Sequence, residues 1–167
     1  MLKHYGQETV TVTGKQPDSA GVTIPPPLIY VMGLILGYCL GLVLPVAFLP
    51  FTPSLILGAV ILLAGLGFAF YAIRTFRRHN TTTIPTRPAT ALVLDGPFRF
   101  TRNPMYLALG ICYAGLALMM DSLLSLLLLI PVILTVNFYV IAKEEEYLTR
   151  KFGDEYRSYM AKVRRWI

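Results

Sequence analysis

The feature that most constrains this chain is a long stretch of sequence without charge. Aspartate, glutamate, lysine and arginine are all missing between Asp18 and Arg74. A membrane-spanning helix needs about 20 apolar residues, so this stretch is long enough for more than one span. The prolines that interrupt it are Pro45, Pro50 and Pro53. Because proline breaks the interior of a helix, we expect two helices here, over 27–47 and 54–76.

Two more uncharged runs follow, at 103–120 and 122–142, and only Asp121 separates them. So short a link predicts an antiparallel helical hairpin, and Pro131 in its second helix predicts a kink or a local gap in backbone hydrogen bonding. Charged residues make up 14% of the 167 residues, against about 25% in soluble domains. The sequence therefore predicts an all-α integral membrane protein with four transmembrane helices.

The basic residues indicate how these helices are oriented. The loop 74–102 carries six arginines against Asp95, and the tail 143–167 carries seven basic and five acidic residues. Cytosolic loops of membrane proteins are rich in lysine and arginine, so we expect both termini in the cytosol and the protein in a prokaryotic inner membrane. The expected parts of this single domain (1–167) are a polar segment 1–26, helices within 27–76, a basic loop 77–102, a hairpin 103–142 and an amphipathic tail 143–167.

Glycines recur at four-residue spacing in the first predicted helix, as Gly33, Gly37 and Gly41. Small residues in register let another helix approach closely. The spacing fits packing inside the chain and also fits the contact of a homodimer, and the sequence does not decide between them.

The first polar segment of interest is T-A-L-V-L-D-G-P-F-R-F-T-R-N-P-M-Y at 90–106. Asn103 followed by Pro104 predicts a helix start, because asparagine caps free backbone amides and proline suits the first helical position. Arg99 and Arg102 precede this start, and a helix N-terminus flanked by arginines attracts anions. The simpler interpretation is that these arginines only set the topology and that the Asn-Pro pair is an ordinary cap.

The second polar segment is the tail 143–167. Its apolar residues recur at spacings of three and four, which predicts one amphipathic helix weakened by Gly153 and lying on the membrane interface. That interpretation leaves Glu144, Glu145 and Glu146 unexplained, because a helix C-terminus prefers cations. We therefore expect a cation to compensate these acids, either arginines of the loop 74–102 or a bound cation.

Other chemistries find little support in the sequence. Cys39 and Cys112 have no second ligand at metal spacing, so no metal site is expected. His4 and His79 are isolated, and we interpret both as solvated surface residues. Asn137 is a polar group inside a span, which favours a hydrogen bond between helices over the lining of a cavity.

Together the two polar segments resemble the superfamily of isoprenylcysteine carboxyl methyltransferases and phospholipid methyltransferases. The matching pattern is G-P-F-R-F-T-R-N-P-M-Y at 96–106, then E-E-x-x-L-x-x-x-F-G-x-x-Y-x-x-Y at 144–159, and V-R-R-W-I at the end. The resemblance covers about residues 70–167. Two separate motifs in the right order, on one predicted side of the membrane, make it specific.

The resemblance implies an S-adenosylmethionine pocket on the cytosolic side, closed over by the C-terminal segment and open laterally to the bilayer. Its implied lining is Thr90, Ala91, Leu92, Val93, Phe98, Asn103, Pro104, Met105, Tyr106 and Glu144. In this scheme Glu144 pairs with the cofactor ammonium, Tyr106 and Phe98 offer aromatic faces to a cation, and the start of the third helix takes the carboxylate. Arg102 and Glu145 have supporting roles. Methyl transfer depends on positioning, so no catalytic nucleophile is expected.

Two departures from the resembled families leave the methyl acceptor open. Asn103 stands where the carboxyl methyltransferases have histidine, and Val140 stands where they have an arginine associated with the substrate carboxylate, with only Lys143 nearby. The form N-P-M-Y instead looks like the phosphatidylethanolamine N-methyltransferases. The expected partners are membrane lipids and a lipophilic substrate, either a lipid amine or a lipophilic carboxylate, and nucleic acid is not expected. The alternatives are an NADPH-dependent reductase of the sterol type and a non-catalytic membrane subunit of the same fold.

Overall fold

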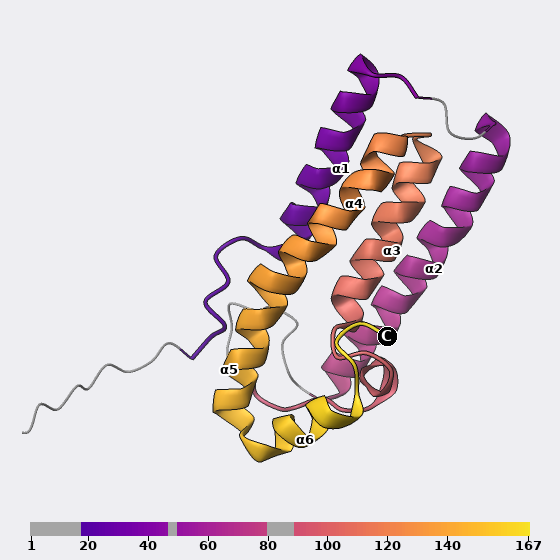
Figure 1. The fold of residues 1–167 in the computed structure, drawn as a ribbon. Coiled ribbons are helices and arrows are strands. Elements are labelled where there is room, and N and C mark those ends of the chain that lie inside the picture. Colours follow the sequence, from indigo (N-terminus) through magenta and orange to yellow (C-terminus); the bar gives the residue numbers. More distant parts are fainter. Residues whose placement is uncertain (1–17, 47–49, 80–88) are drawn as a thin grey trace, which may run out of the picture.

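The computed structural model describes residues 18–46, 50–79 and 89–167, and these ranges contain helices and no strands (Figure 1). The N-terminal part of the polar segment 1–26, including His4, and the middle of the basic loop lie outside the described residues. The α-helices are α1 (Pro26–Val43), α2 (Phe51–Arg78), α3 (Pro104–Met119), α4 (Leu123–Thr135), α5 (Ala142–Phe152) and α6 (Asp154–Lys162). A 3-10 turn, η1 (Gly96–Arg99), precedes α3, and a π-helical turn, η2 (Val136–Ile141), joins α4 to α5.

Prolines set the ends of the first two helices, although not where the sequence predicted. Helix α1 ends at Val43, two residues before Pro45, because the residue before a proline is disfavoured in helical conformation. Helix α2 begins at Phe51 and contains Pro53 in its first turn. A proline is tolerated there because the first amides of a helix lack intrahelical partners in any case.

Three helices of the described chain are long and apolar enough to cross a membrane. They are α1, residues Thr52–Arg78 of α2, and the continuous helix Leu123–Phe152 that α4, η2 and α5 form. Their surfaces carry exposed apolar side chains such as Leu63 and Phe70, at 67% and 66% exposure, which water would not favour. Helix α3 has 16 residues, a length of about 24 Å against a hydrocarbon core of about 30 Å. The third predicted span, 103–120, is therefore shorter than a typical membrane-crossing helix.

The long helices pack as two main pairs, α1 along α4 and α2 along α3 (Figure 1). Helices α3 and α4 also contact each other and are joined by the short turn Met120–Ser122. Between α2 and α3 the backbones nearly touch, since a Cβ atom on Gly58 would lie 2.6 Å from the carbonyl oxygen of Gly115. Small residues permit this approach, and it draws α3 into the bundle.

The glycines of α1 serve packing inside the chain. A Cβ atom on Gly33 would lie 2.4 Å from Val132 of α4, and one on Gly37 would lie 2.4 Å from the backbone of Ser125. Gly41 lies at the same interface, with a built Cβ atom 3.4 Å from Ser122. Of the two interpretations of this spacing, the structure therefore shows the intrachain one. A homodimer through these three glycines stays a prediction, and it would have to use a face that α4 already covers.

Helix α4 continues through Pro131, where the kink stays a prediction, and the π-turn η2 begins five residues later. The hydroxyl of Thr135 donates a hydrogen bond of 2.8 Å to the carbonyl oxygen of Pro131 between them. A π-turn inserts one extra residue per turn and often marks a functional site. It changes which side chains of the helix face the rest of the bundle.

The predicted single amphipathic helix in the tail is wrong in one respect. Gly153 adopts φ +57° and divides the tail into α5 and α6, because a glycine in the left-handed region is a common helix terminator. The chain reverses there, and α6 leads residues 163–167 back to the start of α3 (Figure 1). We call residues 163–167 the C-terminal strap.

Candidate functional site

The start of α3 and the helix that continues α4 meet at a phenol–carboxylate contact. The hydroxyl of Tyr106, in the first turn of α3, donates a hydrogen bond of 2.5 Å to Glu144 in the first turn of α5. Tyr106 is buried, and the carbonyl oxygen of the same residue accepts a 3.0 Å hydrogen bond from Tyr30 of α1. The start of α3 and the start of α5, which are far apart in the sequence, are thus in direct contact. This is the side of the bundle on which the two polar segments were expected to meet.

Glu145 lies between two arginines. Arg102 approaches its carboxylate to 2.9 Å, with 12% exposure for each side chain, and Arg165 of the strap binds the same carboxylate through two nitrogens. Glu146 pairs with Arg150 on the surface at 2.7 Å. The acids at the end of the fourth span are therefore compensated in part by Arg102 of the basic loop, as expected, and in part by the strap, which was not expected. We call Arg102, Glu144, Glu145 and Arg165 the charged cluster.

Backbone contacts fix the strap against the entry to α3. The amide of Arg102 donates to the carbonyl oxygen of Arg164 at 3.0 Å. The carbonyl oxygen of Arg165 accepts from the Thr101 hydroxyl at 3.2 Å and from the Asn103 side-chain amide at 2.9 Å. The strap is thus tied to three consecutive residues before Pro104.

The predicted role of Asn103 as a side-chain cap is wrong. Asn103 does occupy the N-cap position, and Pro104 does begin α3, but the asparagine side chain makes no capping hydrogen bond. Its amide nitrogen turns to the strap instead. A carboxamide has both donors and an acceptor. The predicted cap would have used the side-chain oxygen of Asn103, whereas the observed hydrogen bond uses its amide nitrogen.

Phe98 is a core residue. Its ring is 6% exposed and packs edge-on against Phe76 of α2, with 4.9 Å between ring centroids. The carbonyl oxygen of Phe98 accepts a 2.7 Å hydrogen bond from the Tyr159 hydroxyl, and burial raises the pKa of Tyr159 above its ordinary range. The structure therefore gives the Phe98 ring an aromatic partner rather than an open face for a cation.

The remaining predicted residues divide by position. Leu92 and Val93 pack in the same small core as Phe98, beside α6. Thr90 is exposed and Ala91 is half-buried, in the segment that follows Ala89, whose amide donates to the Tyr147 hydroxyl at 3.1 Å. Pro104 is buried and Met105 is half-buried at the start of α3. Asn103 binds the strap and Tyr106 binds Glu144 of the charged cluster, whereas Leu92, Val93 and Phe98 belong to the separate small core.

Sequence reasoning missed three residues of this site. Asn137, in η2, accepts hydrogen bonds from Arg165 and from the indole nitrogen of Trp166, both at 3.1 Å. The predicted helix–helix hydrogen bond of Asn137 is therefore wrong, since its acceptor is used by the strap. The signals that could have found this contact were a polar residue inside a span and the terminal V-R-R-W-I motif.

The segment before α1 also reaches this end of the molecule. Asp18 accepts a hydrogen bond from Tyr147 at 2.9 Å and pairs with Lys151 at 2.6 Å, both on α5. Lys151 lowers the pKa of the exposed Asp18 carboxyl by hydrogen bonding to it. Ala20 and Val22 are buried in the core that contains Tyr106. Residues 18–22, in the polar segment to which the sequence assigned no role, thus contribute to the packing around the site.

His79 is an exposed surface residue, as predicted, but it is not isolated. Its Nε2 lies 2.9 Å from a carboxylate oxygen of Asp95. This contact links the end of α2 to the residue before η1, so it helps to position the segment that leads to α3.

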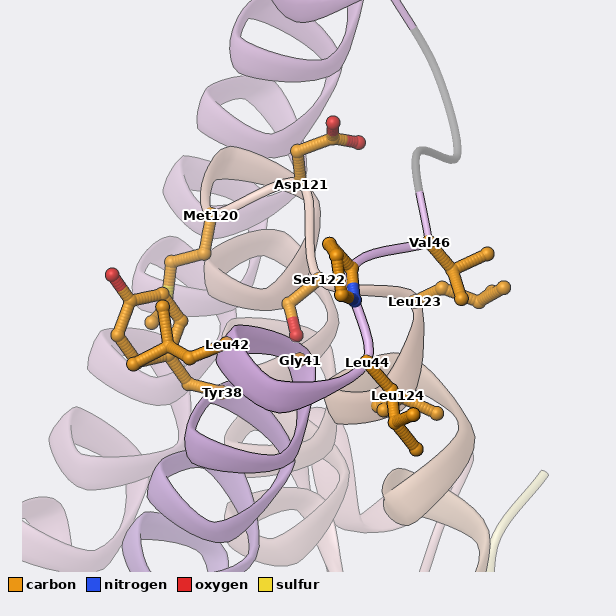
Figure 2. A pocket seen from close by; sticks show the side chains of 11 residues that line it. Tyr38, Gly41, Leu42, Leu44, Val46, Met120, Asp121, Ser122, Leu123 and Leu124 are labelled. Carbon is orange, nitrogen blue, oxygen red and sulfur yellow. The ribbon is translucent and has the colours of Figure 1, made fainter.

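A hollow of about 390 Å³ lies at the opposite end of the bundle (Figure 2). It is lined by the end of α1, by residues 44–46 and by the α3–α4 turn with the start of α4. Figure 2 shows Tyr38 and Leu42 on one side of it and Ser122 and Leu124 on another. Met120 and Tyr106 are 14 residues apart on α3 and its cap, which is about 21 Å along a helix. This hollow is therefore separate from the charged cluster.

The charged cluster has one buried polar atom without a partner. The Nε atom of Arg102 is buried and has no hydrogen-bond partner within the part of the chain that the structure describes. An unpaired buried N–H is costly, and a guanidinium N–H suits a carboxylate. Glu144 is the chain neighbour of Glu145, the ion-pair partner of Arg102, so the site offers an anionic group near this cationic one. These residues fit the amino-acid part of S-adenosylmethionine, which carries an ammonium and a carboxylate.

The long apolar helices define a helical integral membrane protein, which has the charged cluster at one end of its bundle. A model of the phospholipid methyltransferase family matches residues 53–155, more than half of the chain, and the chain belongs to this family. The chain is also similar to an uncharacterized protein of Haemophilus influenzae, with 48% identity over 63 residues, which is 38% of this chain and all of the relative. No solved structure matches the chain. The family match includes Tyr106, Asn137 and Glu144 but neither α1 nor the C-terminal strap.

Proposed function

We propose that this protein transfers a methyl group from S-adenosylmethionine to a lipophilic acceptor at the cytosolic face of the membrane. The observation that carries the proposal is the contact of Tyr106 with Glu144 beside the orphaned Nε of Arg102. Membership of the phospholipid methyltransferase family supports methyl transfer as the chemistry. It also favours this reaction over an NADPH-dependent reduction.

The site residues have separate tasks in this proposal. Glu144, oriented by the Tyr106 hydroxyl, would bind the ammonium group, and Arg102 would bind the carboxylate through its free Nε. When bound, S-adenosylmethionine supplies an electrophilic methyl group on a sulfonium. Displacement at that methyl needs alignment and exclusion of water, which the strap and the buried wall around Val93 and Phe98 would provide.

Of the two acceptors left open by the sequence, we propose the lipid amine. The position where related carboxyl methyltransferases carry an arginine for the substrate carboxylate is Val140, which is 0% exposed in the core. A buried valine has no charge to offer to a carboxylate. Lys143 lies one turn further, and its ammonium stacks on the ring of Tyr139 at 4.3 Å from the centroid, so this cation already has a partner.

The proposed topology has four spans with both termini in the cytosol. Arg77 and Arg78 end α2 on the side of the molecule where the charged cluster lies, and lysine and arginine favour the cytosolic side. Helix α3 would complete the set as a short span packed against α2. Similarity to a bacterial protein supports a bacterial inner membrane.

Two measurements test the proposal. Isothermal titration of the detergent-solubilised protein with S-adenosylhomocysteine should show saturable binding, because this product keeps the amino-acid part and the nucleoside. A membrane lipid extract incubated with the protein and labelled S-adenosylmethionine should then yield a methylated lipid, identified by mass spectrometry.

The outcomes separate the three candidate functions. Stabilisation against heat by NADPH and not by S-adenosylhomocysteine would support the reductase instead. Binding of neither ligand, with the fold intact by circular dichroism, would support a non-catalytic subunit. Methylation of a lipid carboxylate and not of an amine would keep the enzyme and correct its acceptor.

A further inference from the structure

Asn137 is a polar residue placed in the single π-turn that interrupts the helix Leu123–Phe152. Its side-chain oxygen accepts two hydrogen bonds, from Arg165 and from Trp166. Both donors belong to the C-terminal strap. A carboxamide inside an apolar span is costly unless it is hydrogen-bonded, so this contact is a reason for the polar residue to be there.

The same strap residue continues to the charged cluster. The Arg165 guanidinium divides its nitrogens, since Nη1 binds Asn137 while Nε and Nη2 bind the two oxygens of Glu145. Glu145 in turn pairs with a terminal nitrogen of Arg102. A planar guanidinium held at two places has a fixed orientation. Asn137 is therefore the end of a chain of contacts that leads to Arg102.

This series of contacts determines the state of one atom, the Nε of Arg102. Arg102 uses a terminal nitrogen for Glu145, which leaves its buried Nε unpaired. If Arg165 were free to move, Glu145 would be free to rotate and to take the whole of the Arg102 guanidinium. Holding Arg165 in place keeps the Nε of Arg102 available.

We propose that Asn137 is a positioning residue that fixes Arg165 and Glu145 so that Arg102 presents its free Nε to the carboxylate of the bound ligand. This inference rests on the proposed function and deepens it. Asn137 acts through Arg165 and touches neither ligand nor acceptor. Its effect should be specific for ligands that carry a carboxylate.

Two ligands separate positioning from general stability. S-adenosylhomocysteine carries the amino-acid part, whereas 5′-methylthioadenosine has the same nucleoside and thioether sulfur but lacks the ammonium and the carboxylate. Both are titrated into the full chain in detergent. The variants are Asn137→Leu, which removes the acceptor at similar volume, and Asn137→Asp, which keeps an acceptor for both donors. The matched control is Phe138→Leu, the next position in the same π-turn, with a side chain that is 70% exposed.

We expect Asn137→Leu to weaken S-adenosylhomocysteine binding about tenfold or more, the loss of one hydrogen bond to a charged group, and to leave 5′-methylthioadenosine binding within about twofold of wild type. Asn137→Asp and Phe138→Leu should bind both ligands like wild type. Equal losses for both ligands, or unchanged binding of S-adenosylhomocysteine by a folded Asn137→Leu protein, would overturn the inference.

A second variant covers the case in which Asn137→Leu does not fold. Arg165→Met breaks the same contact from the chain terminus, outside the helical bundle, and should produce the same difference between the two ligands. Wild type that binds S-adenosylhomocysteine, with Arg165→Met binding equally well, would overturn the inference and leave the proposed function standing. Wild type that binds neither ligand would overturn both.

Discussion

The two ends of the helical bundle both contain buried polar groups but use them differently. At the α3–α4 turn, Ser125 donates to the backbone of Leu34, Tyr113 donates to the backbone of Ser125, and Ser54 donates to the backbone of Leu118. At the other end, Arg102 before α3, Glu145 of α5 and Arg165 of the strap bind one another, and the Nε of Arg102 has no partner among the described residues. Polar groups that satisfy backbone atoms stabilise a helix junction. In the proposed function, the donor that the charged cluster leaves free is the one that binds the ligand.

The largest effect should come from Glu145→Ala. This change leaves Arg102 and Arg165 without their shared carboxylate, and removing one partner of a buried ion pair costs about 3–5 kcal/mol. We expect the strap to detach and S-adenosylhomocysteine binding to fall below detection in titration. If this variant bound S-adenosylhomocysteine as wild type does, the charged cluster would not be needed for binding, and the proposed difference between the two ends of the bundle would be wrong.

The next effect should come from Glu144→Ala. If this carboxylate binds the ligand ammonium, the variant should lose about 1–3 kcal/mol of binding free energy for S-adenosylhomocysteine, the range for hydrogen bonds to charged groups. Glu146→Ala is the matched control, because Glu146 is exposed in the same turn and pairs only with Arg150 among the ion pairs of the described residues. Equal affinities for the two variants would exclude Glu144 from the site.

A smaller effect is expected for Tyr106→Phe. This variant removes the hydroxyl that orients Glu144 and keeps the ring in the core. A hydrogen bond to a carboxylate contributes about 1.5–3 kcal/mol, but the ligand ammonium itself would hold Glu144 in place. We therefore expect a fivefold to tenfold loss of affinity, as an order of magnitude, measured in the same titration. A gain in affinity would show that Tyr106 competes with the ligand.

The smallest effect on binding should come from the opposite end. Ser122→Ala removes the hydroxyl that caps α4 by accepting from the amide of Ser125. Loss of such a cap costs about 1 kcal/mol of stability, visible as a lower midpoint of thermal unfolding. S-adenosylhomocysteine should bind as it does to wild type. A loss of affinity as large as that of Glu144→Ala would mean that the two ends are coupled and that the comparison is wrong.

Part of this architecture could be read from local sequence. The positions of Pro45, Pro53 and Pro104 predicted helix boundaries to within a few residues, because the effect of proline on the backbone is local. The apolar runs predicted helices because the length of a hydrophobic stretch is also a local property of the sequence. The meeting of Tyr106 with Glu144 followed from topology, since an antiparallel pair of helices returns the chain to the side from which it started.

Other features could not be read in this way. The side chain of Asn103 has the right position for a cap, but the strap competes for it. The strap reaches it only because Gly153 reverses the chain. Asp18 and Tyr147 are far apart in sequence and share no pattern. Each of these contacts depends on where another segment of the chain comes to lie.

The sequence by itself determined an apolar helical protein with its two polar segments on one side, because hydrophobic length, proline and charge act on each segment separately. The tertiary structure alone decided which groups of those segments pair and which one stays free. Arg102 pairs with Glu145, which also binds the strap, and only the packing of these segments settles that its Nε has no partner among the described residues. The physical reason is that hydrogen bonds and ion pairs require exact distances and directions, which a linear pattern does not contain.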